Sequence, residues 1–171
     1  MQRTAARKGN VKINRMILAP AGIKAGRFCL ATGVTAYLAD SAETALYEAV
    51  FRRELKTYVA LEDLRLKALG TFTSKKPLRL VDLRGLEEQY PVLQSQRIQH
   101  TQAFAEECFG DGYDGILYAA AQHPHHECVC LFEVGAKKLG FAEALPLVKP
   151  GTDILHSAVV DAARRSGVEI T

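Results

Sequence analysis

The chain has 171 residues, of which 48% are hydrophobic and 24% are charged, and its formal net charge is +3. These values are typical of one globular domain that buries its core without crosslinks. Apolar runs end well short of the roughly twenty residues of a membrane span. The basic residues are not clustered as on a nucleic-acid surface, so we expect neither a membrane protein nor direct nucleic-acid binding.

The N-terminal part predicts a tail followed by a strand. Residues 1–10 are basic and polar, and they lack the apolar segment and cleavage site of a secretory signal, so we expect a basic tail on a cytoplasmic protein. Residues 11–18 alternate in part between apolar and polar side chains, which predicts a strand that Pro20 and Gly22 end. Arg15 on this strand lies either beside a binding site or towards solvent.

The next stretch predicts a turn, a strand and a helix. Gly26 permits a tight turn before Arg27 and Phe28, because glycine has no side chain to clash. Residues 34–39 are β-branched and aromatic enough to form a strand. Asp40, with Glu43 three residues later, has the form of a capping box, so we predict a helix over residues 41–55.

Glu48 lies on the polar side of this predicted helix. The apolar residues Ala45, Leu46, Ala49 and Val50 fall on the other side. From the pattern alone, Glu48 is an ordinary solvated carboxylate in a weak helical ion pair with Arg52.

The rest of the chain predicts strands and helices in alternation, and therefore an α+β domain. The interval after the first helix is ambiguous, with a strand at 57–59 or at 64–68. A polar, turn-rich connection and a run of glutamines on a solvated helix face complete the middle of the chain. The predicted elements are a connection at 70–77, a strand at 78–83, a helix at 91–109 with Gln94, Gln96, Gln99 and Gln102, strands at 115–119, 128–134 and 141–148, and a helix at 153–165 that Gly167 ends.

A cluster of histidines and cysteines permits two interpretations. Imidazoles and thiolates at short spacing are zinc ligands, but this cluster lacks the second ligand pair of the usual structural sites. Cys128 and Cys130 alternate with apolar neighbours, so buried, reduced thiols on one face of a strand explain them without metal, and we assign no metal site. His123 is then either a solvated loop residue or a proton donor and acceptor near a cleft. The cluster comprises His123, His125, His126, Cys128 and Cys130, with Cys29 and Cys108 elsewhere.

Three segments together resemble the RES-domain family, the toxins of bacterial RES–Xre toxin–antitoxin pairs. They are GRF at 26–28, YLADSAETALYE at 37–48, and YDGILY at 113–118 followed by a polar loop and CLF. The resemblance implies a RES-like domain over 11–171 with a mixed, split sheet and flanking helices, as in ADP-ribosyltransferases. It also implies NAD as a substrate rather than a bound cofactor, and an Xre-like helix-turn-helix antitoxin as partner. Oligomer formation is left open.

The resemblance also assigns the site residues. Glu48, Arg27 and Tyr37 match the glutamate, the arginine and the strand tyrosine of the family, and the resemblance implies that these three are catalytic. We expect Arg27, Phe28, Tyr37 and Tyr118 to contact the substrate. Loss of nicotinamide from NAD puts positive charge on the ribose, which a carboxylate stabilises. The planar guanidinium of an arginine matches phosphate oxygens, and a tyrosine ring can stack on nicotinamide.

One position departs from the family pattern. The family's serine, two residues after the tyrosine of the DGILY segment, is Ala120 here. The leading hypothesis is an enzyme that cleaves the nicotinamide–ribose bond by hydrolysis, phosphorolysis or ADP-ribosyl transfer. The alternative is a RES-fold module that binds NAD or a partner with little turnover, and a third is a small metal-binding protein built on the histidine and cysteine cluster.

Overall fold

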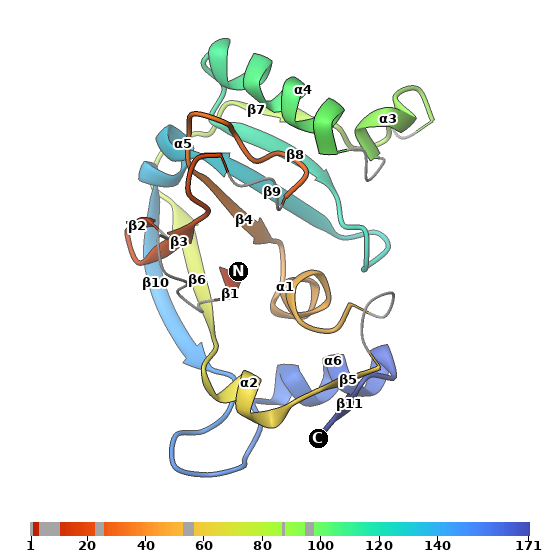
Figure 1. Cartoon of the computed structure of the whole chain (residues 1–171). Coiled ribbons are helices and arrows are strands. Elements are labelled where there is room, and N and C mark those ends of the chain that lie inside the picture. Colours follow the sequence, from red (N-terminus) through yellow and green to blue (C-terminus); the bar gives the residue numbers. More distant parts are fainter. Residues whose placement is uncertain (1, 4–10, 23–25, 53–56, 87, 95–97) are drawn as a thin grey trace.

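The strands of the protein form two main sheets and two short strand pairs (Figure 1). The computed structural model describes residues 2–3, 11–22, 26–52, 57–86, 88–94 and 98–171. The four-stranded sheet has the order β4-β9-β8-β7, in which β8 and β7 are parallel and the other pairs antiparallel. Its strands are β4 (Thr35–Ala39), β7 (Leu80–Asp82), β8 (Gly115–Ala119) and β9 (Glu127–Phe132).

The second sheet and two strand pairs complete the β-structure. The three-stranded sheet is antiparallel, with β6 between β1 and β10. A short hairpin joins β2 to β3, and the last strand pairs in parallel with β5. These strands are β1 (Gln2–Arg3), β2 (Val11–Ile13), β3 (Met16–Leu18), β5 (Tyr58–Val59), β6 (Ala68–Ser74), β10 (Leu139–Pro146) and β11 (Glu169–Ile170).

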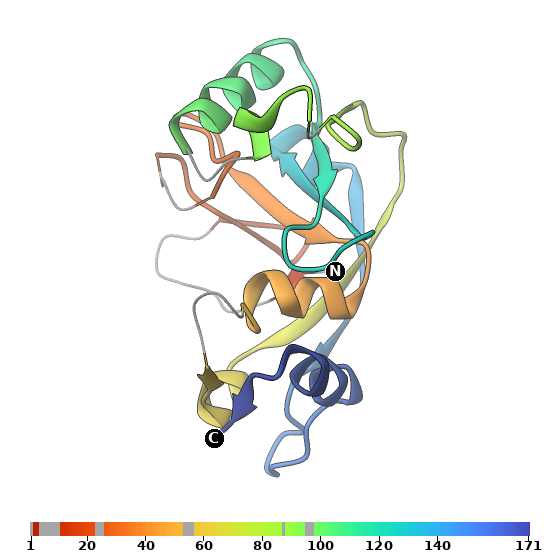
Figure 2. The same cartoon turned by 90° about the vertical axis from the view of Figure 1, so that its right-hand side faces the viewer.

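Helices cover both sheets. Helix α1 lies between the four-stranded sheet and α6, and α4 lies along the outer side of β7 and β8 (Figures 1 and 2). The mixed strands and flanking helices confirm the predicted α+β class. The helices are α1 (Ala42–Ala49), α2 (Leu61–Arg65), α3 (Pro91–Gln94), α4 (Ile98–Gly110), α5 (Glu133–Lys137) and α6 (Ser157–Ser166). In the described part of the chain, no helix has the length and apolar character needed to cross a membrane.

The two faces of the four-stranded sheet belong to different apolar clusters, because successive residues of a strand point to opposite faces. Cys130 and Tyr118 face the larger cluster, which α1 and Phe28 complete, whereas Leu38 and Leu131 face a smaller cluster under β3 and α5. All four cysteines are free and buried, so the prediction of buried thiols on one face of the strand is confirmed for Cys128 and Cys130.

Several predicted boundaries near the N-terminus are corrected. The single strand predicted at 11–18 is a hairpin, because Asn14 and Arg15 both adopt positive φ and form a two-residue turn. The cap of α1 is Ser41, whose side chain accepts the N–H of Thr44, and not Asp40. Helix α1 ends at Ala49, and residues 53–55 of the longer predicted helix lie outside the described residues. Within the predicted tail, Gln2–Arg3 pairs with β6.

Later boundaries are corrected in the same way. The strand predicted at 57–59 is present as β5, whereas the alternative at 64–68 begins in helix α2 and reaches β6 only at Ala68. The connection predicted at 70–77 is mostly β6: Thr71, Phe72 and Thr73 favour a strand, and pairing with β1 and β10 supplies its hydrogen bonds. The strand predicted through residue 134 gives way to α5 at Glu133, and α6 begins at Ser157 rather than at 153. The strand at 115–119 and the end of α6 at Gly167 are confirmed.

Candidate functional site

Arg27 is held against an aromatic wall. Its guanidinium carbon lies 4.7 Å from the centre of the Tyr118 ring and 5.4 Å from that of Phe28. The two rings contact each other, with centroids 5.1 Å apart. An aromatic face attracts a cation without neutralising its charge. Arg27 therefore keeps the positive charge that phosphate binding requires.

The turn that carries Arg27 is tied to the sheet and to α4. The Tyr37 hydroxyl accepts the N–H of Phe28 at 2.9 Å, and the Gln102 side chain donates to the Gly26 carbonyl at 3.0 Å. A β-carbon at Gly26 would lie 2.5 Å from the Tyr37 hydroxyl oxygen, so only glycine fits there. Gln102, expected on a solvated face, is thus part of the support of Arg27.

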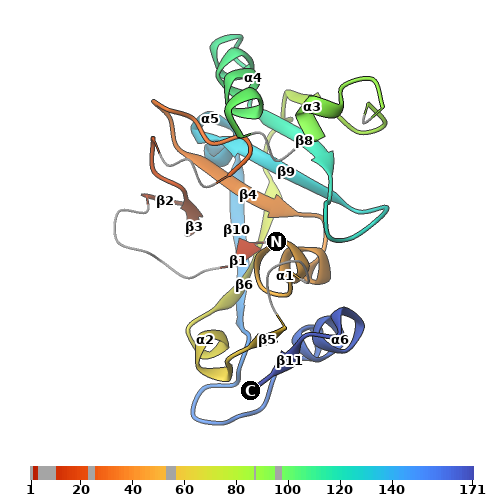
Figure 3. The ribbon, with the colours of Figure 1, turned by 45° about the vertical axis from the view of Figure 1, so that its right-hand side comes forward.

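Glu48 is held from the opposite side. It lies near the end of α1, and its Oε1 accepts the backbone N–H of Gln122 at 2.8 Å. Gln122 belongs to the loop 120–126 between β8 and β9, which comes down beside α1 (Figure 3). The carboxylate is therefore half-buried and oriented by the backbone, unlike the solvated residue that its sequence pattern indicates.

The opposite charges of Arg27 and Glu48 act on the same buried side chains. Burial raises the pKa of Tyr118 well above its usual range. The positive charge of Arg27 lowers this pKa, and the negative charge of Glu48 raises it. Cys128 follows the same pattern: burial raises its pKa to about 12, Glu48 adds to the rise and Arg27 opposes it. Tyr118 and Cys128 are paired across β8 and β9, so both charges influence neighbouring positions of the sheet.

The remaining predicted contacts are placed differently. Phe28 is fully buried, so its ring supports Tyr118 from inside the core and offers no face to a ligand. The Tyr37 hydroxyl is used within the turn, and burial, followed by the nearby Cys130 and Cys29, raises its pKa far above its usual range. Arg15 lies elsewhere, with its guanidinium 4.8 Å from the ring centre of Phe141 on β10.

The histidine cluster has a structural environment of its own. His123 Nδ1 lies 2.8 Å from the hydroxyl of buried Thr44, and its ring stacks on His126 at a centroid distance of 3.7 Å. His126 in turn pairs with Asp40. Over the described residues, no three histidine, cysteine or acidic side chains are arranged to hold a metal ion.

Ala120, at the position of the family's serine, belongs to the larger apolar cluster. Ala120 is almost fully buried, and its N–H donates to the His126 carbonyl at 2.8 Å, which closes the loop 120–126. Its methyl group packs into the larger cluster. This side chain supplies no hydroxyl.

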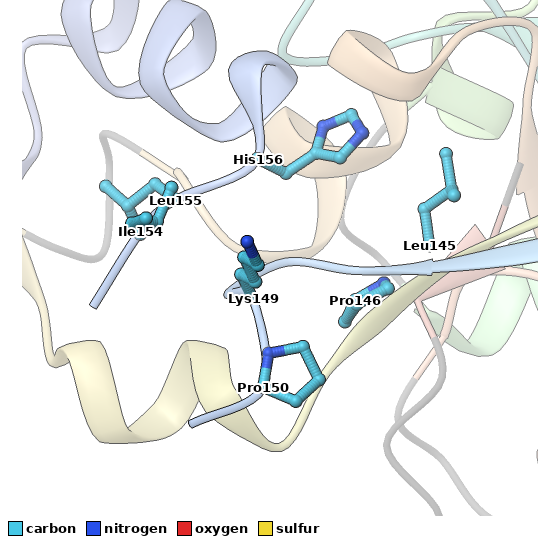
Figure 4. A pocket seen from close by; sticks show the side chains of 7 residues that line it. All are labelled: Leu145, Pro146, Lys149, Pro150, Ile154, Leu155 and His156. Carbon is cyan, nitrogen blue, oxygen red and sulfur yellow. The ribbon is translucent and has the colours of Figure 1, made fainter. Parts of the chain in front are cut away.

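A separate hollow of about 180 Å³ lies at the far end of β10 (Figure 4). None of the predicted site residues lines it. Its walls are mainly apolar, which suits an alkyl or aromatic group better than a charged dinucleotide. The lining residues are Leu145, Pro146, Lys149, Pro150, Ile154, Leu155 and His156.

Comparison with known proteins identifies the family. Among solved structures, the protein is similar to a chain of the M. tuberculosis MbcT–MbcA toxin–antitoxin complex, with 19% identity, a TM-score of 0.58 and coverage of 71% of each chain. At this identity the likeness supports the fold alone. No significant match was found among curated proteins. A profile of the RES domain matches residues 3–148, which is most of the sequence, so the chain belongs to the RES-domain family.

Proposed function

We propose that this protein consumes NAD by cleaving the bond between nicotinamide and ribose, and that it is the toxin of a toxin–antitoxin pair. The observation that supports the first part is that Arg27 packs on Tyr118 of β8, while Glu48 accepts the Gln122 N–H from the loop that follows this strand. A dinucleotide with an anionic pyrophosphate and a ribose that becomes cationic needs both charges in one site. The acceptor is water, phosphate or a protein side chain.

The residues have distinct roles in this reaction. Glu48 stabilises the positive charge that develops on the ribose ring as nicotinamide leaves, and the Gln122 N–H keeps the carboxylate oriented while this happens. Arg27 binds the pyrophosphate through its planar set of donors. Tyr118 and Tyr37 act on Arg27: one supports its guanidinium and the other fixes its turn.

The enzymatic part is tested by release of free nicotinamide from NAD. Glu48→Gln keeps the size of the side chain and removes its charge, so we expect kcat/KM to fall by about 100-fold or more. Glu62→Gln, at an exposed position of α2, is the matched control and leaves the rate unchanged. Undiminished release from Glu48→Gln, at equal folded content by circular dichroism, removes Glu48 from the mechanism.

The toxin part rests on the family and on the solved relative, which was crystallised as a toxin–antitoxin complex. We infer an Xre-like helix-turn-helix antitoxin as the partner. Induced expression of the wild-type chain is expected to arrest bacterial growth, and expression of Glu48→Gln is not. Equal growth with both chains contradicts the toxin assignment.

A second candidate follows from Ala120. In this candidate, the buried Ala120 supplies no hydroxyl, and the protein is a RES-fold module that binds NAD or a partner and turns over slowly. Calorimetric binding of NAD with no nicotinamide release over hours distinguishes this candidate from the enzyme.

A further inference from the structure

The loop 120–126 lies along one face of α1, and two hydrogen bonds join them. Thr44 and Glu48 are four residues apart, so their side chains lie one above the other on the helix. Glu48 accepts the Gln122 N–H at 2.8 Å, and the Thr44 hydroxyl lies 2.8 Å from His123 Nδ1. Neighbouring residues of the loop therefore meet neighbouring turns of the helix.

The contact between His123 and Thr44 is supported by several neighbouring side chains. Thr44 is fully buried, and its hydroxyl also lies 2.7 Å from that of Ser41, the N-cap of the helix. The edge of the His123 ring meets Tyr47 at a centroid distance of 4.9 Å, and its face stacks on His126. The imidazole is thus held on three sides.

We propose that His123 is a positioning residue: its hydrogen bond to Thr44 holds the Gln122 N–H against Glu48 and so sets the orientation of that carboxylate. This inference rests on the proposed function for its effect on turnover. Consecutive Cα atoms are only about 3.8 Å apart, so anchoring His123 limits where the Gln122 N–H can lie. Displacement of a reacting group by about 1 Å can lower a rate by about 100-fold.

The charges around His123 make this anchor sensitive to pH. Burial, and next the positive charge of His126, lower the pKa of His123. Glu43 and Asp40 act in the opposite direction, and Arg165 adds to the lowering. The folded loop thus favours neutral His123. The anchor is complete above the ordinary histidine pKa of about 6.5 and weakens as pH falls through the lowered pKa of His123, because the folded loop disfavours its charged ring.

The structural half of the proposal is tested by amide hydrogen exchange at Gln122, which needs no turnover. We expect His123→Ala to speed this exchange by about tenfold, the equivalent of one lost hydrogen bond. His123→Asn keeps a polar group for Thr44 and retains most of the protection. Thr44→Val removes the same hydrogen bond from the helix side, and it is expected to act like His123→Ala. His125→Asn, at an exposed position of the same loop, is the control.

The functional half is tested by the kinetics of nicotinamide release. His123→Ala is expected to lower kcat by about 10- to 100-fold with KM changed less than about threefold, and His123→Asn to restore most of kcat. The wild type loses activity on the acid side as His123 protonates, and His123→Asn lacks that limb. Unchanged exchange at Gln122 in both His123→Ala and Thr44→Val overturns the positioning role. Absence of turnover in the wild type instead refutes the proposed function and leaves the exchange result to decide the inference.

Discussion

Tyr37, which the resemblance predicts to contact substrate, supports the turn that carries Arg27. Its hydroxyl accepts the N–H of Phe28 and lies 3.5 Å from the Cys29 sulfur, inside the turn that presents Arg27. The absence of a side chain at Gly26 makes room for this hydroxyl. The motif GRF and Tyr37 therefore form one structural unit. In our proposal, Arg27 is the member of this unit that binds the ligand.

We predict that Tyr37→Phe destabilises the protein by about 1–2 kcal/mol, because the half-buried Phe28 N–H loses its acceptor. The displaced Arg27 then raises KM for NAD more than it lowers kcat. Urea unfolding and steady-state kinetics measure the two effects. Tyr58→Phe, at a position that is 61% exposed, is expected to change stability by less than about 0.5 kcal/mol. Equal effects of the two substitutions contradict the assignment.

The helix ends determine the position of two elements around the site. Helix α1 begins at the Ser41 cap and stops after Ala49, which leaves Glu48 in its last turn, within reach of the loop 120–126. Helix α6 packs beside α1, and Arg165 in its last turn binds Glu43 of α1. The left-handed conformation of Gly167 (φ 68°) ends α6 and turns the chain into β11. The Ser41 cap and Gly167 thus fix where α1 begins and where α6 ends.

For this reason we predict that Gly167→Ala destabilises the protein by about 1 kcal/mol, since an L-residue in the left-handed region is strained. Space is not the cause, because a β-carbon there would meet no atom within 4 Å. Gly110→Ala, at the end of α4, is the matched control: it has equal space and no positive φ, so we expect no loss or a gain of up to about 1 kcal/mol. Thermal unfolding of both variants measures the difference.

At the scale of the whole molecule, a buried ion pair joins the two sheets. Asp114 precedes β8, and its carboxylate accepts from Lys138 Nζ at 2.6 Å and from the Arg79 N–H at 2.7 Å. The Asp114 side chain is 3% exposed, and that of Lys138, which precedes β10, is 29% exposed. Both sheets therefore depend on one partly desolvated pair, and we expect them to unfold in a single transition.

We predict that Lys138→Met lowers the free energy of unfolding by about 2–3 kcal/mol, because it leaves the Asp114 carboxylate buried without its cation. The double variant Asp114→Asn with Lys138→Met removes that charge and recovers part of the loss. Urea unfolding followed by both fluorescence and circular dichroism measures these effects. A double variant less stable than Lys138→Met, or two separate transitions in the wild type, contradicts this description.

The sequence by itself determined the fold class, the family and several elements, because these depend on local pattern. Strand β8, the end of α6 at Gly167 and the alternation of Cys128 and Cys130 were readable from residues close together in the chain. Boundaries set by distant pairing were not. Strand β6 pairs with β1 and β10, although Gly70 and the polar residues up to Pro77 favoured a turn-rich connection in the sequence.

Only the tertiary structure decided how the candidate site is built. Glu48 meets a backbone N–H that lies 74 residues away, Arg27 meets Tyr118, and Gln102 supports the turn before Arg27. No local periodicity encodes such contacts, since each depends on which segments the sheet brings side by side. The pairing of β8 with β9 and of β9 with β4 places the loop 120–126 over α1, and this arrangement turns an ordinary helix carboxylate into an oriented one.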